Sequence, residues 1–352
     1  MKDLFLPALL SVAIAQSCNA ASPNAGAAVR PGEASNVVAA LAERAAKRGD
    51  ATVTGTNGWL FLSAELRFLT AGKFWGPEAS KVSRSRKPQW ADPLTAIIDF
   101  NDQLGRKGIT LLVVPVPPKT AIYPEQLAPD TTQISDLTLA LASFYQELQS
   151  KNVKVIDLTP LFLAHKSDGP NALFCRTDSH WSGYGCVIAA QAIAAAVRQQ
   201  PGTTVGGKRY EGEWKQVTID GDLRTLSPEA VTIGMEKIAV RQIAEHGTGR
   251  QVQSDPNSEL VLLGDSHTLV FHDFLAKDAG LADQLAFELG IAPELIGTRG
   301  SGATAVRLTF YRRTLNDPNY LKKKRVVVWC FAAREFTESE QGWVPEPISP
   351  PG

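Results

Sequence analysis

Two short polar motifs contain the residues best suited to nucleophilic catalysis. "LVLLGDSH" (260–267) places Ser266 at the end of an apolar run that is typical of a buried strand. "TDSHW" (177–181) places Asp178 and His180 two positions apart in a polar break before an Ala-rich stretch. A serine nucleophile needs a base to take its proton, and that base needs a carboxylate to fix its tautomer. We therefore expect Ser266, His180 and Asp178 to form a catalytic triad.

Each motif also has a purely structural interpretation. A serine after a buried strand is often only the N-cap of the next helix, and Asp178 could cap a helix while His180 packs under Trp181. The chain has five histidines, of which His267 and His272 follow the serine closely. A residue adjacent in sequence rarely reaches back to the serine hydroxyl in line. His180 is therefore the better base, and we expect His267 and His272 to line the pocket.

The elements that must position these motifs alternate between strands and helices. Apolar, β-branched runs of the kind found in strands covered on both faces occur at 109–116, 153–158, 259–265 and 322–331. Helical periodicity occurs between them, at 92–108, 134–152 and 181–202. This alternation predicts an α/β fold in three layers, with a mainly parallel central sheet flanked by helices.

The N-terminal sequence indicates an exported protein, and the charge balance bears on its partners. Lys2 precedes a twelve-residue apolar run, which is too short to span a bilayer and suits the core of a signal peptide. We expect a cleaved signal peptide over 1–20 and a linker over 21–34, in preference to a lipid anchor on Cys18 or an uncleaved membrane anchor. The net charge is zero, which argues against a nucleic-acid partner.

The rest of the chain is expected to form one domain, over 35–345. The Gly-rich stretch 201–258 is less periodic, and we interpret it as an insertion or lid with short strands. Residues 346–352 are expected to form a flexible tail. Export would allow Cys175 and Cys186, which flank the TDSHW motif, to form a disulfide; two buried free thiols are the alternative.

The two motifs together resemble those of the SGNH-hydrolase-like polysaccharide O-acetyltransferases, the alginate O-acetyltransferase group. In ordinary SGNH esterases the GDS block comes first and the Asp-x-x-His block last. Here Asp178 and His180 precede Ser266, which is similar to the circularly permuted order of the alginate group. Supporting motifs that resemble this family occur at 57–62 ("NGWLFL"), 113–127 ("VVPVPPKTAIYPEQL") and 325–336 ("RVVVWCFAAREF"). One departure is Cys330, where the family commonly has a Glu after the Trp.

The resemblance implies a periplasmic O-acetyltransferase with an SGNH-hydrolase-like fold. Its triad would move an acetyl group through an acetyl-serine intermediate onto hydroxyls of an alginate-like exopolysaccharide. It implies a membrane protein that donates acetyl, and a polysaccharide biosynthesis or export complex, with no metal and no cofactor. The alternatives are an SGNH-type carbohydrate acetylesterase and a non-catalytic glycan-binding subunit of such a complex.

Further residues are candidates for contacts with substrate. Backbone N–H groups near Ser266 and Gly302 are expected to hold the tetrahedral oxyanion. Arg299 could hold an oxyanion or a uronate carboxylate, or be an ordinary surface arginine. Lys119 and Tyr123, from the proline-rich motif, could line a polymer groove or lie on a solvated rim.

Overall fold

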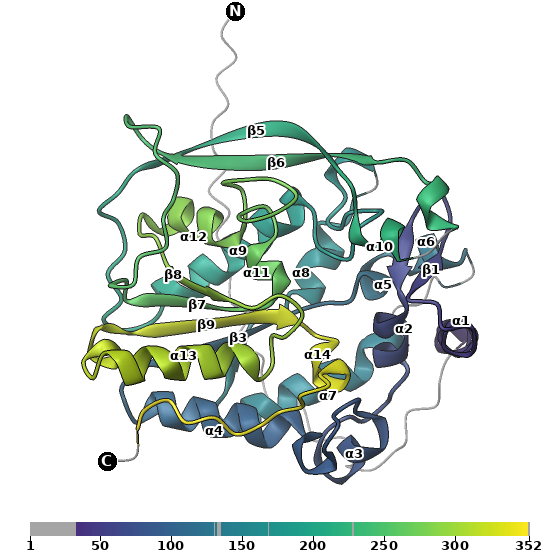
Figure 1. Cartoon of the computed structure of the whole chain (residues 1–352), viewed down its shortest axis with the longest axis horizontal. Helices are drawn as coiled ribbons and strands as arrows, with labels where there is room; N and C mark the ends of the chain where they lie inside the picture. The colour runs from purple at the N-terminus through teal and green to yellow at the C-terminus, as the bar shows by residue number, and fades with distance from the viewer. Residues whose placement is uncertain (1–32, 130, 132–134, 168, 227–228, 351–352) are drawn as a thin grey trace, which may run out of the picture. The chain divides into compact units, whose positions relative to one another are not determined.

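The computed structural model describes residues 33–350 apart from 130, 132–134, 168, 227 and 228 (Figure 1). The expected signal peptide, most of the linker, and Cys18 lie outside the described residues. Within the described part of the chain, no helix combines the length and the apolar character that a membrane crossing requires.

A five-stranded parallel sheet lies at the centre of the fold, in the order β4-β3-β9-β7-β8. Every neighbouring pair in this sheet is parallel, so the expected mainly parallel sheet is confirmed. The strands are β3 (Thr110–Val116), β4 (Lys154–Val155), β7 (Leu260–Gly264), β8 (Glu294–Gly297) and β9 (Val326–Ala332). The carboxyl ends of β3, β9 and β7 meet at one edge, where ligands of such sheets usually bind.

Helices cover both faces of this sheet, which gives the three expected layers (Figure 1). On β9, Val326 and Val328 face a core that includes α9, while Val327 and Trp329 face a core that includes α4. This alternation is the two-residue period of a strand buried on both sides. One face carries α8 (Thr159–Ala164), α9 (Gly183–Arg198) and α12 (Leu281–Leu289), and the other α4 (Pro93–Gly105), α7 (Ser135–Ser150) and α13 (Ala305–Asn316).

Smaller elements surround the carboxyl edge of the sheet. The turn at Asn57 and Gly58 has positive φ angles of 51° and 78°, and it joins two antiparallel strands. These strands are β1 (Thr52–Thr54) and β2 (Leu60–Leu62). The remaining helices are the sixteen-residue α1 (Glu33–Arg48) and the shorter α2 (Ser63–Leu69), α3 (Ala79–Val82), α5 (Lys119–Ile122), α6 (Pro124–Leu127), α11 (Ser266–Leu269) and α14 (Glu335–Glu338).

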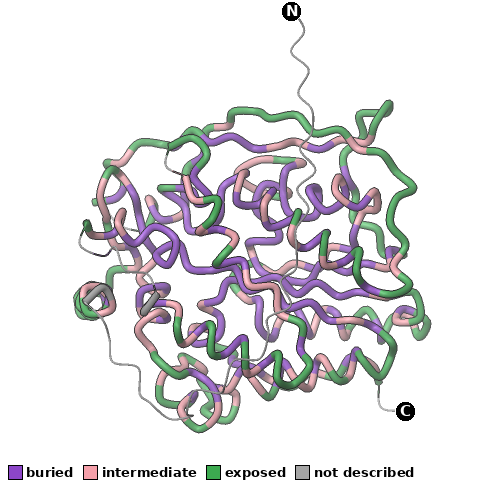
Figure 2. Tube along the Cα trace, turned by 180° about the vertical axis from the view of Figure 1, so that it is seen from behind, coloured by how far each residue is buried: buried purple, intermediate pink, exposed green. Residues whose placement is uncertain are grey.

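The stretch 201–258 forms a long antiparallel hairpin outside the central sheet. Its strands are β5 (Tyr210–Ile219) and β6 (Glu236–Glu245), with α10 (Asp222–Thr225) between them. Each strand has ten residues, so the expectation of short strands is wrong. The inner strand β6 packs on α9 and α12, while β5 is mostly exposed (Figures 1 and 2).

Two expectations about the periphery need correction. Residues 346–348 of the expected flexible tail are held along α4, because Gln103 bonds the main chain of Glu346 and Ile348 at 3.0 Å each, and Ile348 is only 2% exposed. Cys175 and Cys186 do not form a disulfide: both are free, buried thiols. The Cys175 Sγ lies 3.5 Å from the carbonyl of Trp181, whereas that of Cys186 lies 3.9 Å from the carbonyl of Ala279.

Gly264 ends β7 at a point where the chain leaves no room for a side chain. A Cβ there would lie 1.9 Å from the carbonyl oxygen of Cys330 and 2.5 Å from Cγ2 of Thr268. We expect Gly264→Ala to lower the free energy of unfolding by about 2 kcal/mol or more in urea denaturation. Gly105→Ala is the matched control, because a Cβ there meets nothing within 4 Å. Equal stability of the two variants would contradict this account of the close approach.

Candidate active site

Asp178, His180 and Ser266 form a continuous hydrogen-bonded chain at the carboxyl edge of the sheet. The Nε2 atom of His180 lies 2.8 Å from Oγ of Ser266, and its Nδ1 atom lies 2.6 Å from Oδ1 of Asp178. Ser266 begins α11 immediately after β7, and it remains partly exposed. The structure thus brings together the two motifs, which are 86 positions apart along the chain.

The buried pair Asp178 and His180 is arranged to hold a negative carboxylate against a basic imidazole. Burial raises the pKa of Asp178, but the opposing charge and hydrogen bond of His180 outweigh it and hold this pKa below its usual value. For His180, burial lowers the pKa, and the Asp178 carboxylate more than compensates, so the net pKa is raised. The ring is therefore a stronger proton acceptor than an ordinary imidazole, as a general base requires.

Lys119 supports the loop that carries Asp178 and His180 (175–181, here called the catalytic loop) and is not part of a polymer groove. Its side chain is 0% exposed, and its ammonium donates to the carbonyls of Cys175 and Asp178 at 2.8 Å and of Arg176 at 3.3 Å. Tyr123 is also fully buried. The groove role considered for Lys119 and Tyr123 is therefore wrong, and so is the solvated rim.

Tyr123 braces the chain just upstream of the loop. Its hydroxyl accepts a hydrogen bond from the backbone N–H of Leu173 at 2.9 Å and donates to the carbonyl of Ser167 at 2.9 Å. Its ring packs against Trp59, with centroids 4.6 Å apart. The motifs at 57–62 and 113–127 therefore meet in space, and together they form the support under the catalytic loop.

The hairpin region braces the same loop from the other side through Asp222. The backbone N–H of Asp222 donates to Oδ2 of Asp178 at 2.9 Å, and its carboxylate accepts from the N–H and the hydroxyl of Ser179 at 2.7 and 2.6 Å. Gly221 makes this approach possible, since a Cβ there would lie 2.1 Å from the carbonyl of Thr177. Sequence analysis missed Asp222 because no local pattern links it to the TDSHW motif.

Glu236, at the start of β6, provides a second brace from the hairpin. Its buried carboxylate accepts from the backbone N–H groups of Arg176 and Thr177 at 3.0 and 2.9 Å, and from the Thr177 hydroxyl at 3.0 Å. The stretch 201–258 thus holds the catalytic loop in place, which differs from the lid considered for it.

His267 and His272 do not act as expected. The His267 ring is 1% exposed and lies beside His180, with centroids 4.8 Å apart, so it is buried behind the base instead of lining the pocket. Burial lowers the pKa of His267 to about 4, although the Asp265 carboxylate lies 3.4 Å from its Nδ1 atom and opposes the shift, and the ring is neutral near pH 7. His272 bonds Asp283 of α12 at 2.9 Å, and no described hydrogen bond joins it to the triad.

The Gly302 N–H, expected to hold an oxyanion, is already engaged. It donates to Oε2 of Glu335 at 3.2 Å, and Gly302 packs so closely on Asp265 that a Cβ there would lie 3.1 Å from Cβ of Asp265. Burial, with the nearby charge of Asp265, raises the pKa of Glu335 to about 7 although Arg334 opposes the shift. The expected oxyanion role of Gly302 is therefore wrong for this arrangement.

Arg334 places a positive charge beside the triad, and sequence analysis missed it. Its guanidinium donates to Glu65 at 3.2 Å, and the other oxygen of Glu65 accepts the backbone N–H of Lys119 at 3.0 Å. The His267 ring and, to a lesser degree, the charge of Arg334 lower the pKa of Asp265, while the same charge of Arg334 opposes the net rise in the pKa of His180. The available signal was its position directly after β9, the strand that pairs with β7.

Arg299 lies one aromatic ring away from His180. It is exposed, and its guanidinium carbon lies 4.0 Å from the ring centroid of Phe274. The Phe274 ring in turn meets the His180 ring edge to face, with centroids 5.6 Å apart. Arg299 is therefore a surface arginine that stacks on Phe274, the ring that contacts His180. A substrate bound at His180 could still be contacted by Arg299.

One group of described residues has the composition of a metal site. Donor atoms of Asp178, His180 and Asp222 lie within 4.8 Å of one another. These atoms are already committed: the two ring nitrogens of His180 face Asp178 and Ser266, and the Asp222 oxygens hold Ser179. A metal ion would have to displace the hydrogen bonds that build the triad.

Comparison with known proteins places this geometry in a family context. A family model described as "SGNH hydrolase-like domain, acetyltransferase AlgX" matches residues 52–333. The probable alginate O-acetylase AlgJ of Pseudomonas syringae pv. tomato is 28% identical over 184 residues, covering 50% of this chain and 41% of that protein. The alginate biosynthesis protein AlgX of Pseudomonas fluorescens is 28% identical over 248 residues, covering 66% and 48%. The chain spans less than half the length of either relative.

Solved structures share the fold. The O-acetyltransferase domain of Pseudomonas putida AlgJ superposes with a TM-score of 0.61 at 22% identity, covering 82% of this chain and 92% of that one. AlgX of Pseudomonas aeruginosa superposes with a TM-score of 0.60 at 16% identity, covering 86% and 66%. At these identities the likeness establishes the three-layer fold alone.

The raised pKa of His180 gives a pH-dependent prediction. Protonated His180 cannot accept the Ser266 proton, so hydrolysis of 4-nitrophenyl acetate should fall as the pH drops through a midpoint above 6.5, the ordinary value. Asp178→Asn removes the charge that raises this pKa. We expect the midpoint of kcat/KM against pH to move lower, and the rate to fall roughly 10²–10⁴-fold. Asp273→Asn, an exposed neighbour, is the control; an unmoved midpoint in Asp178→Asn would refute the assignment.

The bracing role of Asp222 is tested separately. Asp222→Ala removes both bonds to Ser179 but keeps the backbone N–H that holds Asp178, so we expect kcat to fall roughly 10–100-fold as the loop shifts. Asp222→Asn keeps one acceptor and should retain more activity. Asp222→Ala and Asp222→Asn should both lower the midpoint of kcat/KM against pH, because the Asp222 charge helps to raise the pKa of His180. Asp220→Asn is the control, and a wild-type profile in Asp222→Ala would disprove this role.

Proposed function

Because the chain belongs to the family of SGNH hydrolase-like acetyltransferase domains that includes AlgX, we propose that it is an O-acetyltransferase with Ser266 as its nucleophile. The observation that carries the proposal is the unbroken chain of hydrogen bonds from Asp178 through His180 to Ser266, at 2.6 and 2.8 Å. This is the arrangement that generates a nucleophilic alkoxide in acyl transfer. The catalytic domain would cover 35–345.

The first half of the reaction forms an acetyl-enzyme. Oγ of Ser266 attacks the acetyl carbonyl of a donor ester while Nε2 of His180 takes the hydroxyl proton. The tetrahedral intermediate collapses as the donor oxygen leaves with the proton from His180, and the acetyl group remains on Ser266. Asp178 stays ionised throughout, holding the imidazole tautomer and stabilising the imidazolium.

The second half transfers the acetyl group to a sugar. A glycan hydroxyl loses its proton to His180 as its oxygen attacks the acetyl carbonyl, and the bond to Ser266 breaks as the serine regains a proton. Because the Gly302 N–H is held by Glu335, the backbone N–H groups near Ser266, at the start of α11, would hold the oxyanion.

The family relationship also supports a setting for the reaction. The acceptor would be an exopolysaccharide of the alginate type, since the relatives are named as alginate O-acetylases and alginate biosynthesis proteins. A cleaved signal peptide over 1–20 would send the protein to the periplasm, where acetyl-CoA is absent. A membrane protein that supplies acetyl groups would then be needed, within a polysaccharide biosynthesis or export complex.

The acetyl-serine intermediate is the direct test. We expect intact-mass spectrometry to find one added acetyl group after incubation with 4-nitrophenyl acetate, located on Ser266 by peptide analysis. Ser266→Ala and His180→Ala should both remain unmodified while keeping wild-type circular dichroism spectra. Acetylation of folded Ser266→Ala to the wild-type level would exclude this nucleophile.

Product analysis then separates transfer from hydrolysis. With a polymannuronate acceptor and the same donor, O-acetylated glycan supports the acetyltransferase. Free acetate as the sole product, with acetyl-serine formed normally, would identify a carbohydrate acetylesterase instead.

A further inference from the structure

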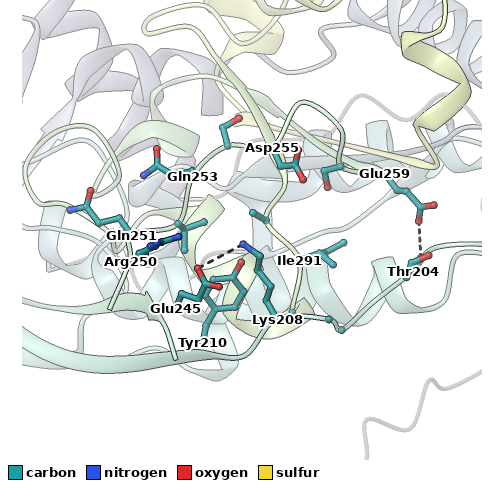
Figure 3. A pocket seen from close by; sticks show the side chains of 17 residues that line it. Thr204, Lys208, Tyr210, Glu245, Arg250, Gln251, Gln253, Asp255, Glu259 and Ile291 are labelled. Atoms are coloured by element: carbon teal, nitrogen blue, oxygen red, sulfur yellow. Dashed lines mark hydrogen bonds and ion pairs between the residues drawn. The ribbon is translucent and has the colours of Figure 1, made fainter. Parts of the chain in front are cut away.

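A cavity lies at the opposite edge of the central sheet from Ser266. It is a groove of about 850 Å³ between the chain entering β5, the chain from β6 to β7, and the turn after α12 (Figure 3). Ser258 and Glu259 line it just before β7, whereas Ser266 follows that strand. The five residues of β7 separate the two places by roughly 17 Å. The groove is therefore distinct from the catalytic site.

Main-chain hydrogen bonds fix the walls of this groove. The N–H of Gly206 donates to the carbonyl of Leu289 at 2.7 Å, and that of Lys208 to Gly290 at 3.0 Å. Across the groove, the Glu259 carboxylate accepts the N–H of Thr204 at 2.9 Å. These contacts tie three separate segments together, so the cavity is preformed and a ligand would lose little of its binding energy to ordering the protein.

The lining combines an aromatic ring with many hydrogen-bonding groups. The half-buried Tyr210 ring lies on the hairpin side, beside Lys208 and Glu245, while Gln253 and Asp255 lie on the opposite side (Figure 3). Burial raises the pKa of Tyr210, and the carboxylates of Glu245 and Asp255 raise it further, so both carboxylates lie near the phenol. A flat ring surrounded by carboxylate and amide groups suits a pyranose, whose apolar face stacks while its hydroxyls form hydrogen bonds.

The charged side chains that line the groove favour neutral sugars over uronates. Two cations, Lys208 and Arg250, stand against three carboxylates, those of Glu245, Asp255 and Glu259. Lys208 is moreover within 3.8 Å of Glu245, which offsets part of its charge. A run of uronate residues would meet more repulsion than attraction here, whereas uncharged sugars would meet none.

We propose that this groove binds neutral sugar residues of the polysaccharide acceptor, away from the point of acetylation. The proposal rests on the acetyltransferase function and corrects the acceptor that the names of the relatives suggest: the acceptor contains neutral hexopyranose units, which a polymer made of uronates alone lacks. A long chain held in the groove raises the effective concentration of its other hydroxyls at Ser266. Short acceptors gain nothing, because they cannot reach both places.

Direct binding tests the class of ligand. Intact Ser266→Ala protein is titrated calorimetrically with hexasaccharides of β-1,4-linked glucose and β-1,4-linked mannose, and with hexamannuronate. We expect a neutral hexasaccharide to bind, with Tyr210→Ala and Gln253→Ala each weakening it about tenfold or more. Tyr311→Ala, on α13 outside the groove, is the matched control. Gln253 is exposed, so its variant keeps the test valid if Tyr210→Ala fails to fold.

Acceptor length tests the role in the reaction. In otherwise wild-type protein, Tyr210→Ala and Gln253→Ala should raise KM for the long neutral acceptor about tenfold and leave a disaccharide acceptor and 4-nitrophenyl acetate hydrolysis unchanged. Tighter binding of hexamannuronate, no binding of either neutral hexasaccharide, or unchanged binding in both variants would overturn the proposal. Loss of acetyl-serine formation in the wild type would instead overturn the proposed function, so the two failures are distinguishable.

Discussion

A carboxylate removed from water, that of Asp178, is the constraint on which this site depends. The residue is 1% exposed, so its charge must be matched by hydrogen bonds from the protein. The His180 ring and backbone N–H occupy one oxygen, and the Asp222 N–H occupies the other. Each of these donors reaches Asp178 only if its backbone lies close to the carboxylate. The tight TDSHW loop and the close contact of Gly221 with Thr177 both follow from that requirement.

Positive and negative side chains alternate beside the triad: Lys119, Glu65 and Arg334 connect α5, α2 and the chain after β9. Lys119 from α5 holds the loop carbonyls, its backbone N–H bonds Glu65 of α2, and Glu65 pairs with Arg334 after β9. Such a network is costly to bury unless every member has a partner, because one missing partner leaves a charge unpaired in a low-dielectric interior. The carboxyl ends of β3 and β9 are thereby held at a fixed position relative to the loop.

The sequence predicts what periodicity and local motifs encode, which here is most of the fold and the three residues joined by hydrogen bonds, Asp178, His180 and Ser266. Buried strands show as continuous apolar runs, and His180 is the better candidate base because His267 and His272 follow Ser266 too closely in sequence.

The sequence does not predict partners that come from elsewhere in the chain. Lys119 has the residue type of a surface position, and only the three carbonyls facing it explain its burial. The sequence likewise does not show that the Gly302 N–H is engaged. In the structure this N–H donates a hydrogen bond to Glu335.

The β5–β6 hairpin joins two regions of the molecule through one ladder. Tyr210 pairs with Glu245 at its groove end, and Ile219 pairs with Glu236 at the end beside the catalytic loop. The ladder has ten residue pairs including these two, which gives a span of roughly 30 Å that a twisted antiparallel ribbon can barely stretch or compress. A polymer anchored at the first end would therefore present the nucleophile with a hydroxyl at a set number of sugar units from its anchor. The hairpin would then act as a molecular ruler, and acetyl groups would be spaced along the product at intervals.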